Sequence, residues 1–206
     1  MRYWKKRKVD DSFKVGIAVV TYNQTSSLAA LIHSIKNQTF LRYKVIVAHD
    51  GPWDMEVLRI CLNAIDGDYR FEIYASGSRN NKFGHELRQV GFDMTKDAGC
   101  NWICTMNGDC WYAPTYLEWM LSQATQEKAN FVFSNLVHSH KLWKPMRSEL
   151  ERGSIDAGNW IAHTNLVGDT EWDSNDFAAD WDFISKLKNK PNFKPAKVDG
   201  YIYVHN

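Results

Sequence analysis

Long hydrophobic runs are the first thing that this 206-residue sequence lacks. No apolar stretch approaches the roughly 20 residues needed to cross a bilayer, so we expect no transmembrane segment. The net charge is only +1, without the basic excess that broad nucleic-acid binding requires. Residues 1–13 form a basic arm without the apolar core of a signal peptide. We interpret it as a frayed arm, with peripheral contact to an anionic membrane surface as the alternative.

Paired cysteines are missing too. The four cysteines do not form the Cys-x-x-Cys pairs of a structural zinc site; they are Cys61, Cys100, Cys104 and Cys110. None has a histidine beside it in the sequence, which argues against a cysteine enzyme. We interpret all four as reduced thiols of a cytoplasmic protein, because disulfides are rare in that compartment.

Apolar runs and helical stripes alternate along residues 14–134. The nearly continuous run at 14–22 predicts a parallel strand that is covered on both faces. Apolar residues spaced three and four apart predict a helix after each of the first four strands. The remaining strands are predicted at 43–48, 70–75, 102–106 and 131–134. This alternation predicts an α/β fold with a mostly parallel, Rossmann-like sheet flanked by helices on both faces.

Beyond residue 134 the pattern loosens. Residues 138–158 are polar, with scattered basic side chains. A strand is predicted at 160–163, a helix at 176–188 and a closing strand at 198–204. No internal repeat or low-complexity tract divides the chain, so its length indicates a single domain.

The strand at 102–106 breaks abruptly at Asn107-Gly108, and Asp109 follows the break. Ligands of open α/β sheets bind beyond the carboxyl ends of the strands. A carboxylate placed there can hold Mg²⁺ or Mn²⁺, which take oxygen ligands and bridge protein to phosphate. The alternative interpretation is an ordinary Asn-Gly turn with a solvated Asp109.

Four landmarks follow one another in a fixed order. The sequence from about residue 15 to residue 205 resembles the family 2 glycosyltransferases, which have the GT-A fold. The landmarks are residues 20–23, 49–51, 107–109 and 179–182. The resemblance implies an inverting, hexosyl-type enzyme that moves one sugar from a nucleoside-diphosphate sugar, most simply a UDP-sugar, to an acceptor hydroxyl. It also implies that residues 14–134 bind the nucleotide-sugar, and that residues 135–206 are the acceptor-side half of the same domain.

The resemblance assigns several residues to the donor. Tyr22 is similar to the residue that stacks near the base, with Asn23 in the same turn. Asp50 corresponds to the acid that accepts a hydrogen bond from the uracil ring. Arg88 falls where the family often carries an arginine that could pair with the diphosphate. Asn107 stands where the family has the first acid of Asp-x-Asp, and could add a neutral oxygen ligand or bind ribose.

The resemblance also supplies a metal site and a base. Asp109 keeps the remaining acid of the metal motif, so Mn²⁺ or Mg²⁺ is the implied cofactor. His205 resembles the late histidine that closes over the diphosphate and the metal. Asp180 resembles the catalytic base that takes a proton from the acceptor hydroxyl, on a glycan, a lipid-linked molecule or a protein. Donor-sugar contacts are placed at Asp156, Asn159 and Trp160.

Two other function classes compete with this interpretation. A nucleotidyltransferase would need a glycine-rich, basic phosphate loop after the first strand, but residues 21–25 contain neither glycine nor a cation. A non-catalytic nucleotide- or glycan-binding module of the same fold is favoured by Asn107 and Cys110, which stand where the family commonly has acids.

Overall fold

The computed structural model describes residues 8–174, 176 and 178–206. Residues 1–7 of the predicted arm, and position 177 of the last predicted helix, therefore lie outside the described residues. The described residues form one nine-stranded sheet with the order β3-β2-β1-β4-β8-β6-β9-β5, and β7 pairs with β6. The strands are β1 (Val15–Thr21), β2 (Tyr43–His49), β3 (Phe71–Ala75), β4 (Trp102–Asn107), β5 (Trp111–Tyr112), β6 (Phe131–His138), β7 (Lys144–Met146), β8 (Trp160–His163) and β9 (Pro195–His205).

Six α-helices and one short 3₁₀ helix are found among the described residues. They are α1 (Ser26–Lys36), α2 (Met55–Ile65), α3 (His85–Asp97), α4 (Tyr116–Glu127), η1 (Ser139–Lys141), α5 (Thr164–Val167) and α6 (Ala179–Lys188). The last helix begins later than predicted because Asp176 makes a turn, accepting hydrogen bonds from the backbone of Ala178 and Ala179.

The first four strands of the prediction pair in parallel. β1 lies between β2 and β4, and β3 adds to the outer side of β2. Every residue of β1 is buried, as its unbroken apolar run predicted. The α/β prediction is therefore confirmed, and the parallel part of the sheet places the carboxyl ends of four strands along one edge.

The other half of the sheet is mixed. β8 runs antiparallel to β4 and β6, β5 runs antiparallel to β9, and β6 and β9 are parallel. β6 extends four residues past its predicted end, to His138, because β7 and β9 continue to pair with it there. The predicted boundary between the nucleotide-sugar half and the acceptor-side half, at residue 134, therefore falls inside β6. Sequence reasoning missed β5, β7 and α5, which are too short for a periodic signal.

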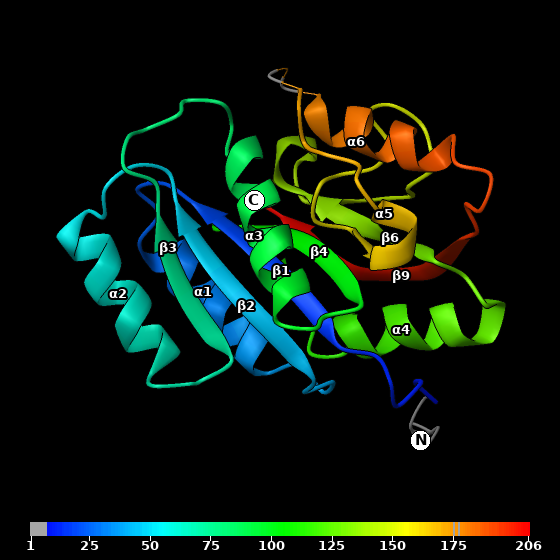
Figure 1. Ribbon diagram of the computed structural model, residues 1–206, viewed down its shortest axis with the longest axis horizontal. Helices are drawn as coiled ribbons and strands as arrows, with labels where there is room; N and C mark the ends of the chain where they lie inside the picture. Colours follow the sequence, from blue (N-terminus) through cyan, green and yellow to red (C-terminus); the bar gives the residue numbers. More distant parts are fainter. Residues whose placement is uncertain (1–7, 175, 177) are drawn as a thin grey trace.

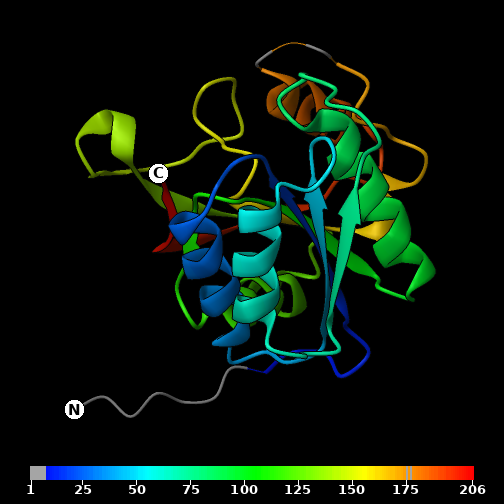
Figure 2. The ribbon, with the colours of Figure 1, turned by 90° about the vertical axis from the view of Figure 1, so that its left-hand side faces the viewer.

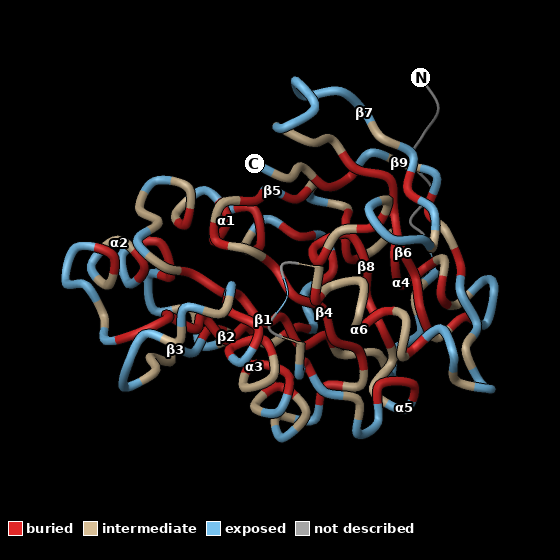
Figure 3. Tube along the Cα trace, turned by 90° about the horizontal axis from the view of Figure 1, so that it is seen from above, coloured by how far each residue is buried: buried red, intermediate tan, exposed pale blue. Residues whose placement is uncertain are grey.

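Helices cover both faces of the sheet (Figure 1). One apolar cluster joins α1, α2 and α4 to the side of β1 that carries Ile17. A second cluster joins α3, α5 and α6 to the opposite side, which carries Ala18. Since side chains alternate along a strand, β1 is buried between two layers of helices. Figure 3 shows the resulting buried interior, with exposed loops around it.

Helix α3 lies unusually close to β1. A Cβ atom added to Gly91 would lie 2.6 Å from the Cβ of Ala18, too close for any side chain. The glycine therefore permits this approach, which brings the first turn of α3 and its Arg88 to the carboxyl edge of the parallel strands.

The sequence predicted no transmembrane segment and four reduced cysteines. None of the helices within the described ranges is both long and apolar enough to cross a membrane. All four cysteines are buried and unpaired, as predicted.

Candidate active site

A cleft of about 820 Å³ opens at the carboxyl edge of β1, β2 and β4. Its opposite wall comes from the ends of β6 and β9, the loop before β8 and the start of α6. The structure therefore brings both halves of the chain together around one cavity. Eight of the predicted site residues line it: Tyr22, Asp50, Arg88, Asn107, Asp109, Asp156, Asp180 and His205.

Two predicted sugar contacts lie elsewhere. Asn159 and Trp160 are fully buried and are not among the residues that line the cleft. The Asn159 amide nitrogen donates to the Ser134 carbonyl at 2.7 Å and to Ser148 Oγ at 2.9 Å, and its oxygen accepts from the Asp156 amide at 3.0 Å. Asn159 thus fastens the loop before β8 to the sheet, which corrects the prediction that it faces a ligand.

The donor contact predicted for Asn23 stays a prediction. Asn23 is exposed, it does not line the cleft, and its backbone is left-handed with φ of 53°. Asparagine tolerates this conformation better than most residues. It lies in the turn that follows β1, directly after Tyr22.

The outer end of the cleft holds an aromatic ring, a cation and an acid. The Arg79 guanidinium carbon lies 3.7 Å from the centre of the Tyr22 ring, a cation–π contact. Asp50, only 6% exposed, accepts hydrogen bonds from the backbone nitrogens of Asn80 at 2.8 Å and Asn81 at 3.4 Å. Sequence reasoning missed Arg79, because the Gly, Ser and Asn around it indicated only a loop.

Arg88 is a buried cation in the middle of the cleft wall. It is 5% exposed. Its Nη2 donates to Asn107 Oδ1 at 2.6 Å and its Nη1 to the Phe83 carbonyl at 2.7 Å. Its buried Nε has no hydrogen-bond partner, and no carboxylate lies at ion-pair distance from it, among the described residues. A buried cation held by neutral groups favours an anionic ligand, since an unpaired buried charge is costly.

His85 keeps Arg88 in place without adding charge. Arginine can only donate, so His85 Nδ1, at 3.1 Å from Arg88 Nη1, must be the acceptor. The other ring nitrogen then donates to the Asp176 carbonyl at 3.0 Å. Burial, together with the nearby Arg88, lowers the pKa of His85 to about 4, which agrees with this neutral tautomer.

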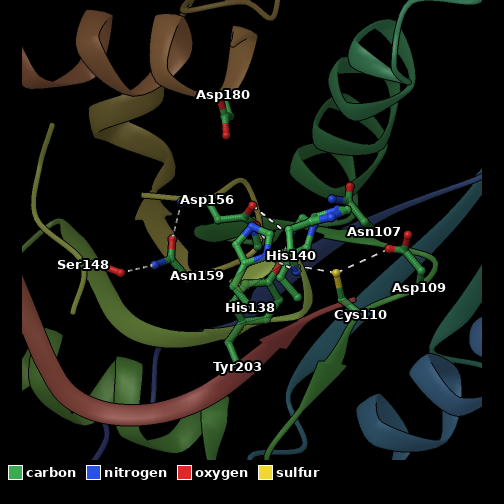
Figure 4. A network of polar contacts seen from close by, with 12 residues as sticks. Asn107, Asp109, Cys110, His138, His140, Ser148, Asp156, Asn159, Asp180 and Tyr203 are labelled. Carbon is green, nitrogen blue, oxygen red and sulfur yellow. Dashed lines mark hydrogen bonds and ion pairs between the residues drawn. The ribbon is translucent and has the colours of Figure 1, made fainter. Parts of the chain in front are cut away.

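Asp156 is the centre of a bonded network on the opposite wall (Figure 4). One oxygen accepts from the Tyr203 hydroxyl at 2.6 Å and from the Gly158 amide at 2.9 Å. The other oxygen lies 2.9 Å from His205 Nδ1. Burial raises the pKa of Asp156, but its bonds with His205 and Tyr203 outweigh burial and hold it below the usual range. The same contact raises the pKa of His205 against the effect of its own burial.

Cys110 extends this network. It is 1% exposed, and its sulfur lies 3.2 Å from the Tyr203 hydroxyl. Burial raises the pKa of the thiol, so the position where the family commonly has a third acid carries a neutral group here. Sequence reasoning missed Tyr203 because the pairing that brings β9 beside β5 and β6 is not readable from periodicity.

Asp180 stands apart from the network and points toward it (Figure 4). It occupies the first turn of α6, where its Oδ1 accepts from the Trp181 amide at 2.7 Å. Burial and the nearby Asp156 raise its pKa to about 6, although Arg88 acts in the opposite direction. A carboxylate with such a pKa is ionised at neutral pH yet remains a competent proton acceptor.

The comparison with protein families now decides what this fold is. The family model described as "Glycosyl transferase family 2" matches residues 16–179. The chain belongs to glycosyl transferase family 2. The match covers the carboxyl ends of β1, β2 and β4 and ends one residue before Asp180.

Solved structures agree with this family 2 fold. TarS from S. aureus superposes with a TM-score of 0.76 at 17% identity, over 94% of this chain and 37% of that one. A shorter TarS chain in complex with UDP gives 0.70 at 16% identity, covering 93% and 60%, and its complex with UDP-GlcNAc gives 0.72 at 16% identity, covering 93% and 58%. The predicted GT-A fold is confirmed. The chain spans less than two thirds of these relatives, and no curated protein matches it.

The metal implied by family 2 can be tested against the donor atoms present. Asp109 and His205 line the same cleft. His205 uses Nδ1 toward Asp156, which leaves Nε2 for a metal, as in many carboxylate-oriented histidine ligands. In the described part of the chain, no three His, Cys, Asp or Glu side chains gather to hold an ion. Two protein ligands fit a Mn²⁺ or Mg²⁺ ion that takes its other ligands from phosphate and water.

Proposed function

We propose that this family 2 protein is an inverting glycosyltransferase that moves a single hexosyl group from a UDP-sugar to an acceptor hydroxyl. One observation carries the proposal: Asp180, whose pKa is raised to about 6, lines the same cleft as the buried cation Arg88 and the acid Asp109. A base, a cation for the leaving diphosphate and a carboxylate for a metal are the groups that such a displacement needs.

The donor is assigned to the wall built by residues 14–134. Tyr22, Asp50 and Arg88 all line the cleft; we assign Tyr22 and Asp50 to uracil, and the buried cation Arg88 to the diphosphate. UDP and UDP-GlcNAc, as seen in the TarS complexes, support a uridine nucleotide as the first ligand to try. The acceptor hydroxyl, on a glycan, a lipid-linked molecule or a protein, would approach from the side of Asp180.

Different side chains of the cleft then have different roles in the reaction. Asp180 accepts the proton of the attacking hydroxyl while the bond between the anomeric carbon and the diphosphate oxygen breaks. Arg88 meets the charge that develops on the departing diphosphate, in a buried setting where it is poorly screened. Asp109 and His205 would hold the divalent ion, which when bound neutralises further charge on the diphosphate. Attack from the face opposite the leaving group gives inversion.

The deciding experiment replaces the base. Asp180→Asn should reduce transfer from the UDP-sugar that the wild type uses by roughly 10²–10⁴-fold, while UDP affinity in calorimetry stays within about threefold. Asp182→Asn is the matched control, because Asp182 lies on the same helix but does not line the cleft. Normal turnover by Asp180→Asn, or a product of retained configuration by NMR, would contradict the proposal.

The non-catalytic module remains the second candidate, because Asn107 and not an acid contacts Arg88. Two assays together distinguish a glycosyltransferase from a non-catalytic binding module. A panel of sugar nucleotides is tested with Mn²⁺ for release of the nucleoside diphosphate, alongside calorimetry with UDP. Tight UDP binding without release from any donor, with or without acceptor, would select the binding module.

A further inference from the structure

The hairpin between β6 and β7 carries two bulky apolar side chains at its outermost point. Leu142 is 80% exposed and Trp143 is 57% exposed. Figure 2 shows this segment, in yellow-green, projecting from the body of the molecule beside the C-terminus, and Figure 3 shows its loop as exposed beside β7. We call residues 139–147 the hairpin tip.

The hairpin tip has a defined conformation. The Leu142 amide donates to the Ser139 carbonyl at 2.9 Å, and the Trp143 amide donates to the His138 carbonyl at 3.1 Å. Both residues have left-handed φ angles, 56° and 59°. Bulky residues avoid this region, so the hydrogen-bonded turn imposes it. The turn therefore holds two neighbouring apolar side chains out in solvent, where an isolated monomer gains nothing from them.

Cations flank this apolar pair. Lys141, Lys144 and Arg147 are exposed, and none has an ion-pair partner within the described ranges. No acid occurs between residues 138 and 148, and the next one, Glu149, is paired with Lys197 at 3.1 Å. The hairpin tip thus combines a protruding apolar point with an unbalanced positive charge.

The same hairpin also contributes side chains to the cleft. His138, His140 and Met146 are among the residues that line it. Pairing of His138 with both Lys144 of β7 and His205 of β9 fixes the hairpin to the sheet. Whatever surface binds the hairpin tip is therefore held close to the cleft.

We propose that the hairpin tip docks on an anionic membrane surface and holds the cleft opening next to it. Charge complementarity selects this occupant, because anionic headgroups attract the three cations while Leu142 and Trp143 enter the boundary between headgroups and acyl chains. A glycan is a poorer match, since sugar sites combine a flat aromatic face with convergent polar groups in a concave site. This surface is separate from residues 1–7 and from the donor wall.

Vesicle flotation with the full chain tests the proposal. The wild type should float with vesicles of phosphatidylcholine mixed with phosphatidylglycerol, and much less with phosphatidylcholine alone. Leu142→Ser/Trp143→Ser should weaken binding to the mixed vesicles at least about tenfold. Lys141→Gln/Lys144→Gln should weaken it roughly fivefold for each lysine, and high salt should do the same to the wild type.

Matched variants elsewhere provide the controls. Leu41→Ser/Tyr69→Ser removes two exposed apolar side chains, 61% and 89% exposed, from other loops. Arg59→Gln/Lys194→Gln removes two exposed positive charges from α2 and from the residue before β9, at the opposite end of β6 from the hairpin tip. Both control variants should float as the wild type does, and circular dichroism should show all four variants folded.

Three results would overturn the proposal. The first is a wild type that binds neither kind of vesicle. The second is unchanged flotation of both hairpin variants. The third is dimerisation in sedimentation velocity, or binding to a soluble acidic polysaccharide, that depends on Leu142 and Trp143 while vesicle binding does not. Since flotation needs no nucleotide or acceptor, its failure would leave the proposed sugar transfer untouched.

Discussion

The two walls of the cleft position their polar groups in different ways. On the donor wall, Tyr22, Asp50 and Asn107 stand at the carboxyl ends of three neighbouring parallel strands, so the sheet alone brings them together. On the other wall, Asp156 and His205 meet through hydrogen bonds with one another and with Tyr203. The donor wall thus depends on backbone topology, while the opposite wall depends on its own side-chain network. Substitutions should therefore affect ligand binding on the first and folding on the second.

The largest contrast is expected between two acids. Asp156→Ala removes the acceptor of Tyr203 and the partner of His205, and should lower the free energy of unfolding by about 3 kcal/mol. Asp50→Ala removes an acceptor for two loop amides, and should cost only about 1 kcal/mol. Denaturant unfolding at neutral pH measures both. Equal losses would show that the two walls are built alike.

Replacing Asp180, the proposed base on α6, should change the free energy of unfolding in the opposite direction. Since the pKa of Asp180 is raised to about 6, the folded state binds its proton more tightly than the unfolded state does. Its contribution therefore favours folding at low pH and is lost as pH rises toward 6. Asp180→Asn should gain about 2 kcal/mol of stability at pH 7 and nothing near pH 3. Thermal unfolding across this pH range is the measurement, and a gain that does not vary with pH would contradict this origin.

Adding a negative charge beside Arg88 on the donor wall should have a smaller effect, and it should appear in the affinity for UDP. Asn107→Asp would give Arg88 an ion-pair partner in place of an amide. The cation would then be less available to a diphosphate, so UDP affinity without divalent metal should fall by about tenfold. Calorimetry in the presence of a chelator measures it. Asn192→Asp, which adds the same charge at an exposed position before β9, should leave affinity unchanged.

These contrasts explain how far the sequence alone could be interpreted. The parallel half was predictable, because a fully buried strand such as 15–21 has an apolar run and its polar ends meet at one edge. Asp50, Asn107 and Asp109 were found in this way with the help of the family resemblance. The role of Asn159 was misjudged because a polar residue next to an aromatic residue in the sequence is as compatible with a ligand site as with a buried residue that hydrogen-bonds a loop to the sheet. Only the burial of Asn159 distinguishes the two roles.

The cleft residues that could not be identified from the sequence have one property in common. Arg79 and Tyr203 reach the site through contacts between segments that are distant in the chain. The register of β9 beside β6 shifts between Ser134 and Leu136, and no periodic pattern encodes such an irregularity. Long-range pairing, and not local propensity, placed these side chains.

The smallest expected effect concerns Arg79 and Tyr22 at the outer end of the donor wall. Their cation–π contact holds the Tyr22 ring in the cleft that Asp50 also lines, where a base would stack. Arg79→Ala should weaken UDP binding by about threefold, the size of an exposed cation–π contact. Arg59→Ala, on the exposed face of α2, is the control. A double-mutant cycle with Tyr22→Ala makes the test specific. If the guanidinium acts by positioning the ring, the two losses should fall short of adding; strict additivity would mean that Arg79 contacts the nucleotide independently.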